Sequence, residues 1–186
     1  MTSFNPHTTD TAPEQSRAGL YAAQRKFGFI PNMIGVLAES PAALEAYQAI
    51  GAIFEKSGFS AGEQAILALA VSVENGCDYC VPAYTGLAVK ADVDEAVIEA
   101  VRDGGPIADA RFSALRDFAD QVVAERGLVT DAQVDAFLAA GFTKAQVLEV
   151  IVAAAFKLIS NYTNHVADVP LDEPFKPFHW DGRKAA

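Results

Sequence analysis

The chain has few basic residues. Its 14 lysines and arginines stand against 24 aspartates and glutamates, which gives a formal net charge of −10. Nucleic acids and anionic membranes bind basic surfaces, so this balance argues against both as partners. The most apolar stretch, Val147 to Ile159, is interrupted by Glu149 and Lys157 and does not form the run that a membrane span needs. No basic segment precedes an apolar one at the N-terminus, so we expect a soluble, cytoplasmic protein.

Patterns typical of β-strands are also missing. No useful length of the chain alternates apolar and polar residues, and the one Asn-Gly dipeptide, Asn75-Gly76, lies between helical segments. Hydrophobic residues instead make up 51% of the 186 residues, enough for one domain with a sizeable core. We therefore expect an all-α domain of about seven or eight helices over residues 13–186. A flexible N-terminal tail at 1–12 precedes it, and an extended tail occupies 169–186.

Capping residues predict where the helices start. Ser40-Pro41 combines an N-cap residue with a proline in the first turn, the usual opening of a helix. Four later pairs have capping-box spacing, in which a cap side chain and a side chain three residues on satisfy each other's backbone donors. These pairs are Ser60/Glu63, Asp92/Glu95, Thr130/Gln133 and Thr143/Gln146. We expect a turn at 28–33 and expect the aromatic residues of the C-terminal tail to pack on this molecule or a neighbour: Phe175, Phe178 and Trp180.

Cysteine occurs only twice, in the Cys-x-x-Cys tetrapeptide from Cys77 to Cys80. Two cysteines are too few for a secreted disulfide scaffold, and in a cytosolic chain this spacing indicates a redox site or, less often, a metal site. A structural zinc site needs four ligands, and the chain has no second Cys-x-x-Cys and no His-x-x-His. We therefore expect no metal and no cofactor. A redox-active dithiol and a pair of packed, inert cysteines stay open as alternatives.

The helix junction around the cysteines suits thiol chemistry. A thiolate, not a thiol, is the nucleophile, and the N–H groups and dipole of a helix N-terminus stabilise that anion. Gly76 allows the close turn that such a start requires, and Pro82 is compatible with a first helical turn. The two-residue spacing lets the sulfurs meet across one turn, so a sulfenic acid on one is resolved by the other.

The segment Ala70–Cys80, Ala-Val-Ser-Val-Glu-Asn-Gly-Cys-Asp-Tyr-Cys, resembles the AhpD-like superfamily, which includes alkylhydroperoxidase D and carboxymuconolactone decarboxylase. The segments 28–33, 40–44 and 160–165 resemble its peroxidase-related branch. The resemblance implies an all-α fold, assembly into homo-trimers or homo-hexamers, and reduction of a hydroperoxide. It also implies that Cys80 attacks the peroxide, that Cys77 resolves the product as a disulfide, and that an external thiol or dithiol reduces the pair.

The family pattern and this chain differ at the proton relay. The superfamily usually has a histidine four residues after the second cysteine, where this chain has Tyr84. A tyrosine has a reference pKa of about 10 and is a poor general base at pH 7. Alkylhydroperoxidase D also has a glutamate on the preceding helix, at the position where this chain has Ala65. Because general acid–base help is worth about 10² to 10⁴ in rate, we expect weak or specialised activity.

Two further residues are candidates for the catalytic site. Glu74 either supplies a carboxylate three residues before Cys77 or is a solvated helix-end carboxylate. His165 either replaces the missing relay or caps the C-terminus of its helix. The predicted catalytic residues are thus Cys80, Cys77, Glu74, Tyr84 and His165.

Three functions stay open from the sequence. The leading one is a thiol-dependent hydroperoxide reductase or disulfide oxidoreductase. The second is a lyase similar to carboxymuconolactone decarboxylase, a chemistry that does not need a dithiol. The third is a catalytically impaired oligomeric module, which Tyr84 favours.

Overall fold

A computed structural model describes residues 4–182, which form nine α-helices, one 3₁₀-helix and no β-strand. The helices are α1 (Glu14–Phe27), α2 (Asn32–Leu37), α3 (Pro41–Phe54), α4 (Ala61–Glu74), α5 (Cys80–Lys90), α6 (Glu95–Asp103), α7 (Ala110–Ala124), α8 (Asp131–Ala139), α9 (Lys144–Ala167) and the 3₁₀-helix η1 (Glu173–Phe178). The expected all-α fold is confirmed.

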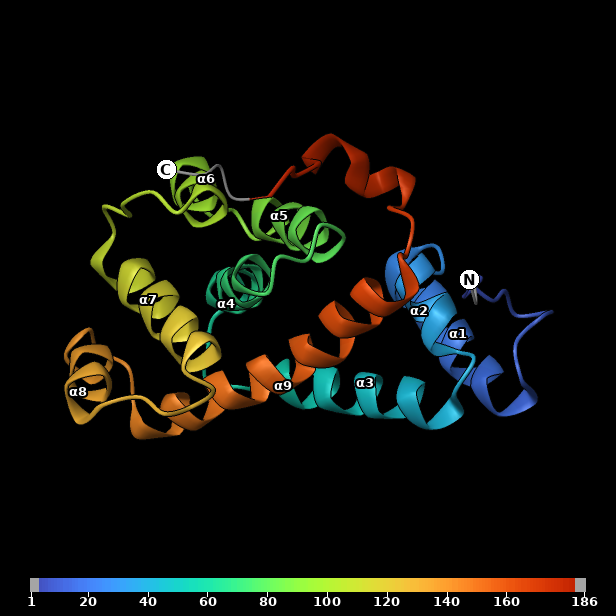
Figure 1. Ribbon diagram of the computed structural model, residues 1–186, viewed down its shortest axis with the longest axis horizontal. Helices are drawn as coiled ribbons and strands as arrows, with labels where there is room; N and C mark the ends of the chain where they lie inside the picture. The colour runs from blue at the N-terminus through green and yellow to red at the C-terminus, as the bar shows by residue number, and fades with distance from the viewer. Residues whose placement is uncertain (1–3, 183–186) are drawn as a thin grey trace.

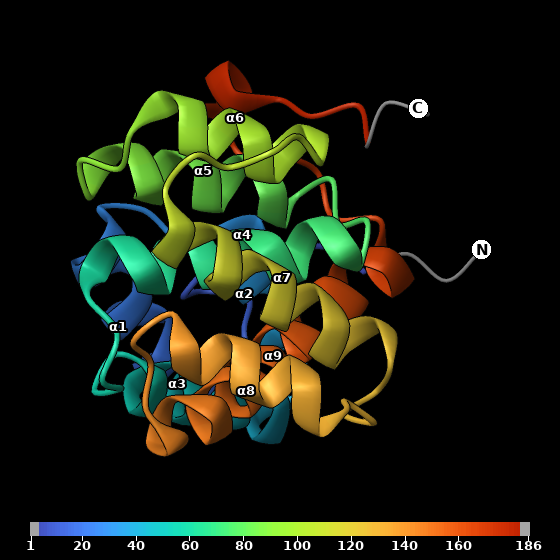
Figure 2. The same cartoon turned by 90° about the vertical axis from the view of Figure 1, so that its left-hand side faces the viewer.

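Helix α4 lies at the centre of the molecule. It packs against α5, α6, α7 and α9 (Figure 1), and every residue from Ala65 to Val73 is buried. A helix that is apolar on all sides is stable only when other elements surround it. In the perpendicular view, α5 and α6 form a layer above α4 and α7, and α3, α8 and α9 lie below them (Figure 2).

Helix α9 runs along the molecule beneath α4 and packs against α2, α3, α4, α7 and α8. By length and composition alone it is the one helix among the described residues that is long and apolar enough to cross a membrane, a test that a core helix of a soluble protein also passes. One side of α9 carries buried polar residues, including Lys157.

The predicted caps are confirmed at four of five helix starts. Ser40 caps α3, and capping boxes open α4, α8 and α9 at Ser60, Thr130 and Thr143. The capping box predicted at Asp92/Glu95 is wrong. Helix α6 is capped by Asp94, whose Oδ1 accepts a hydrogen bond from the Ala96 N–H at 2.8 Å. Asp92 instead has a φ of 55° in the turn after α5, a conformation that aspartate tolerates better than most residues.

The segment 28–33 is only partly a turn. Helix α2 begins at Asn32, after Pro31. It is a helix that the sequence did not predict, and it brings the number of α-helices among the described residues to nine. Its five residues from Met33 to Leu37 are buried, so tertiary packing stabilises a helix too short to persist by itself. Residues 4–12 lie against α2, where His7 N–H donates to Gly35 O at 3.0 Å. The first three residues of the tail expected at 1–12 lie outside the described part, and its flexibility stays a prediction.

Residues 169–182 of the C-terminal tail fold back over α5 and include η1 (Figure 1). The indole N–H of the buried Trp180 donates to Arg102 O at 3.2 Å, and the Phe175 ring packs against Phe29 and Tyr79. The aromatic residues of the tail therefore pack on this molecule. The Tyr79 hydroxyl, which lies between the two cysteines in sequence, donates to the Asp172 carboxylate, so the tail is bonded to the dithiol segment.

Candidate functional site

The dithiol lies at the junction of α4 and α5. Helix α4 ends at Glu74, and Gly76 turns the chain with a φ of +68°, a conformation that glycine adopts without strain. The Asn75 side chain donates to Asn161 Oδ1 on α9 at 2.9 Å and fixes this turn. Cys80 is the first residue of α5. Both thiols are free and buried, with exposed fractions of 0% for Cys77 and 2% for Cys80.

Hydrogen-bond donors surround the two sulfurs. The Cys80 N–H, at the start of α5, donates to Cys77 Sγ at 3.4 Å. The Asn164 amide on α9 donates to Cys80 Sγ at 3.2 Å and to Cys77 Sγ at 3.5 Å. Ser160, one turn earlier on α9, has its Oγ 3.8 Å from Cys80 Sγ. The N–H donors of Cys80 and Asn164 favour a thiolate at this position. Ser160 Oγ instead accepts from the Cys80 thiol, and its own hydroxyl donates to Lys157 O at 3.1 Å.

A buried lysine lies beside these groups. Lys157 has no exposed surface, and its Nζ donates to Ser160 Oγ at 3.0 Å. The same Nζ lies 3.9 Å from the centre of the Tyr84 ring, a cation–π contact. Lys157 takes part in none of the carboxylate ion pairs found within residues 4–182.

The surroundings shift the pKa values of the two cysteines in opposite directions. Burial alone would raise the pKa of Cys80, but a hydrogen bond with Cys77, the positive charge of Lys157 and hydrogen bonds with Ser160 and Lys157 outweigh burial and lower this pKa to about 5. The pKa of Cys77 is raised by its hydrogen bond with Cys80, by burial and by the charge of Cys80. The pair therefore holds one thiolate, at Cys80, and one proton, at Cys77.

The tyrosine at the relay position remains protonated. Burial and the negative charge of Cys80 raise the pKa of Tyr84 well above its ordinary value, although a hydrogen bond with Tyr47 lowers it. The pKa of Tyr47, on α3, is likewise raised by burial and by Tyr84. Both phenols are therefore neutral hydrogen-bond donors near pH 7, and neither is a base.

Comparisons with known proteins support the fold. The model of the carboxymuconolactone decarboxylase family matches residues 38–121, which include the dithiol. Over 94% of its length the chain matches 96% of a solved structure from Ralstonia eutropha JMP134, an uncharacterized peroxidase-related protein described as an alkylhydroperoxidase AhpD core, with a TM-score of 0.81 and 25% identity. The chain therefore has the fold of the AhpD-like proteins, and its residues 38–121 resemble the carboxymuconolactone decarboxylase family.

Two further solved structures share the AhpD-like fold. An uncharacterized peroxidase-related protein from Silicibacter sp. TM1040 is 20% identical, with 88% of this chain and 87% of that chain covered and a TM-score of 0.75. The debrominase Bmp8 is 17% identical, with 95% and 96% covered and a TM-score of 0.78. None of the curated proteins searched matches the chain in sequence.

Three of the five predicted site residues come together, whereas His165 lies apart from them. Cys77, Cys80 and Tyr84 form the centre of the site. His165 is exposed, and its ring stacks on Tyr162 with a centroid distance of 6.2 Å. Glu74 is half-buried at the end of α4.

Sequence reasoning missed three residues of the site, Lys157, Ser160 and Asn164. They lie at positions i, i+3 and i+7 of α9, a spacing that puts them on one face. The spacing of these polar residues along one face of the helix is the sequence pattern from which they could have been predicted. The lone lysine in an apolar stretch argued only against a membrane span.

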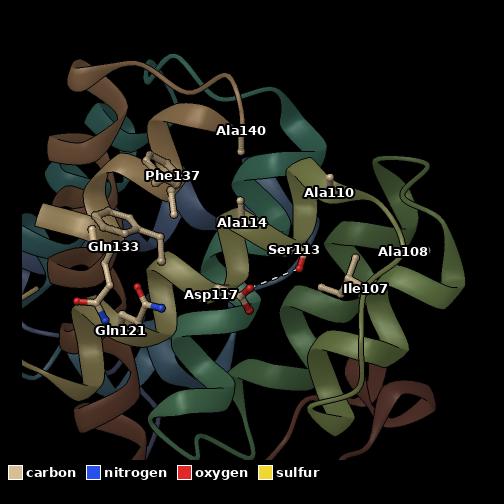
Figure 3. Close-up of a pocket in the computed structure, with 13 residues that line it drawn as sticks. Ile107, Ala108, Ala110, Ser113, Ala114, Asp117, Gln121, Gln133, Phe137 and Ala140 are labelled. Atoms are coloured by element: carbon tan, nitrogen blue, oxygen red, sulfur yellow. Dashed lines mark hydrogen bonds between the residues drawn. The ribbon is translucent and has the colours of Figure 1, made fainter. Parts of the chain in front are cut away.

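Two pockets among the described residues contain no cysteine. One, of about 620 Å³, lies between α7 and α8 and is lined by Ser113, Asp117, Gln121 and Gln133 (Figure 3). The other, of about 420 Å³, is lined largely by apolar residues of α2 and α9. The dithiol packs instead into an apolar cluster with Met33 and Ile34 of α2. Access to the sulfurs therefore requires movement of the groups that cover them.

Proposed function

We propose that the protein is a thiol-dependent hydroperoxide reductase of the AhpD-like kind. The observation that carries this proposal is the asymmetry of the dithiol: the Asn164 amide donates to Cys80 Sγ at 3.2 Å, the Cys77 sulfur lies beside it, and the surroundings lower the pKa of Cys80 and raise that of Cys77. A peroxidatic cysteine must be a thiolate, and its resolving partner must be close enough to form a disulfide. The free thiols suit a reducing compartment such as the cytoplasm.

The proposed reaction has two steps at the dithiol. The Cys80 thiolate attacks the outer oxygen of the hydroperoxide, the O–O bond breaks, and the alkoxide leaves and takes up a proton to become the alcohol. Cys77 then attacks the sulfenic sulfur of Cys80, a disulfide forms, and the S–O bond breaks to release water. An external thiol or dithiol returns two electrons and two protons to the pair.

Peroxide titration of the fully reduced protein tests this function. With hydrogen peroxide or tert-butyl hydroperoxide, we expect both thiols to disappear and a Cys77–Cys80 disulfide to form. Cys77→Ser should accumulate a sulfenic acid at Cys80, which a dimedone-type reagent traps, and Cys80→Ser should not react. Two free thiols that persist under excess peroxide would contradict the proposal and favour the impaired module.

The same dithiol suits a second two-electron reaction, which the likeness to Bmp8 suggests. Another solved structure of Bmp8 holds a cysteine-to-alanine variant of that debrominase in complex with 2,3,4-tribromopyrrole. Reductive removal of bromine would consume the same two thiols and release bromide. Titration with this compound in place of peroxide distinguishes the two reactions, because bromide release accompanies thiol loss only in the second. A lyase is less well supported, because its chemistry leaves the thiolate and its donors without a role.

We also propose that the protein is a homo-oligomer, a trimer or hexamer. Large apolar residues are exposed along one side of α9, which we call the outer face of α9: Leu148, Ile151, Leu158, Tyr162 and Val166. Exposed apolar surface of this extent is typical of an interaction site. A second copy of the chain would remove it from water.

A further inference from the structure

Lys157 places a positive charge in the interior of the protein, next to the dithiol. An ammonium group without exposed surface is costly unless an anion neutralises it. The nearby carboxylate of Glu55 acts on Tyr84 but is itself exposed and forms an ion pair with Lys26. Within the described chain, the positive charge of Lys157 thus faces no dedicated carboxylate.

Apart from the carboxylates of Glu55 and Asp172, which act on Tyr84 and Tyr79, four other titratable side chains around the pair are neutral. Each has a pKa raised by its surroundings, burial being the first cause for the three tyrosines: Cys77, Tyr47 on α3, Tyr79 just before α5 and Tyr84 within it. Cys80 is the one member of this group whose pKa is lowered. The thiolate of Cys80 and the ammonium of Lys157 are therefore each other's counter-ions.

A proton path joins the two groups. Lys157 Nζ donates to Ser160 Oγ at 3.0 Å, and Ser160 Oγ lies 3.8 Å from Cys80 Sγ. The Ser160 hydroxyl itself donates to Lys157 O at 3.1 Å. Rotation of this hydroxyl would turn its proton toward Cys80, and Ser160 would then connect the ammonium to the oxygen that reacts at Cys80. No histidine is needed for this path, and His165 is exposed on another side of the helix.

We propose that Lys157 is the counter-ion of the Cys80 thiolate and the proton donor to the leaving oxygen, so that it gains and loses a proton as the dithiol is reduced and oxidised. This inference rests on the proposed function. The thiolate, the Cys77 thiol, the Lys157 ammonium and ROOH become the disulfide, ROH, water and an uncharged Lys157 amine. In this balance Cys77 and Lys157 supply one proton each. Once the disulfide has formed, the Lys157 side chain, which has no exposed surface, has no thiolate beside it.

The reduced protein, titrated without any peroxide, provides the first test. The ultraviolet absorbance of the thiolate, followed against pH, gives the pKa of Cys80 in the wild type, in Lys157→Met and in Lys157→Arg. We expect Lys157→Met to move this pKa toward the value of about 8.5 for a free cysteine, which lowers the thiolate fraction at pH 7 by about 30-fold. Lys157→Arg keeps the positive charge and should keep the pKa low. A low pKa in Lys157→Met would overturn the counter-ion role.

The number of protons taken up on reduction tests the donor role in the wild type itself. We measure the redox equilibrium with dithiothreitol between pH 6 and 8. Wild type should take up two protons per disulfide reduced, one at Cys77 and one at Lys157. Lys157→Arg, whose charge is permanent, should take up one. One proton in the wild type would mean that Lys157 stays charged in the disulfide state, which refutes the donor role.

These measurements separate the two proposals. They use no peroxide, so a protein that fails to reduce hydroperoxides can still show the lysine–thiolate pair. Conversely, a peroxidase whose Cys80 pKa is unaffected by Lys157→Met retains the proposed function and refutes this inference. If Lys157→Met fails to fold, the proton count of the wild type still decides the donor role.

Discussion

Asn164→Leu should raise the pKa of Cys80 by removing the amide that donates to its sulfur. The Asn164 Nδ2 lies 3.2 Å from Cys80 Sγ, and the side chain is buried, so water does not replace the lost donor. A hydrogen bond to a charged group contributes about 1.5 to 3 kcal/mol. One pKa unit corresponds to about 1.4 kcal/mol. The expected rise is therefore about one to two units, from a pKa of about 5 to about 6 or 7.

Alkylation of the reduced protein by iodoacetamide, followed against pH, measures this shift. Only the thiolate reacts, so the rate rises with pH through the pKa of Cys80. The midpoint of this rise should move to higher pH in Asn164→Leu, with the largest loss of rate between pH 5 and 6. His165→Ala is the matched control, because the adjacent imidazole is exposed. An unchanged midpoint in Asn164→Leu, or an equal shift in His165→Ala, would refute the site geometry.

Three other predictions concern the relay, the outer face and a helix cap. Tyr84→His should increase peroxide consumption, by at most about 10² to 10⁴, and no gain in a peroxide-decay assay would show that a histidine is not what limits the site. Tyr162→Glu should dissociate the oligomer in light scattering, whereas Leu128→Glu, which alters an exposed leucine away from the outer face of α9, should not. Asp94→Ala should lower the free energy of unfolding by about 1 kcal/mol, and Asp92→Gly should not. The reverse order in urea unfolding would restore Asp92 as the cap.

Local patterns predicted the parts of the fold that depend on neighbours in sequence. Ser60, Thr130 and Thr143 cap their helices because each cap and its partner are three residues apart. The same reasoning misplaced the start of α6, because Asp92 and Asp94 are both good caps. Only the geometry of the turn after α5 selects between them. It also missed α2, which depends on burial of residues 33–37 more than on its own signals.

The candidate site divides in the same way. Cys77, Cys80 and Tyr84 were predicted because they belong to one turn and one helix. Asn164, not His165, reaches the sulfurs, because successive residues of a helix point about 100° apart and the packing of α9 against α4 fixes which one faces inward. The two residues are adjacent in the sequence, which does not specify how α9 is rotated about its axis.

The sequence by itself determined the all-α fold, most helix starts and a dithiol at a helix N-terminus, since each depends on residues within a few positions of one another. Tertiary structure decided what surrounds the dithiol. Ser160 and Asn164 are 80 and 84 residues from Cys80 along the chain, and only the packing of α9 beneath α4 and α5 brings them, with Lys157, to its sulfur. A buried charge interacts with the groups that lie next to it in the folded protein, and these groups can be far from it in the sequence.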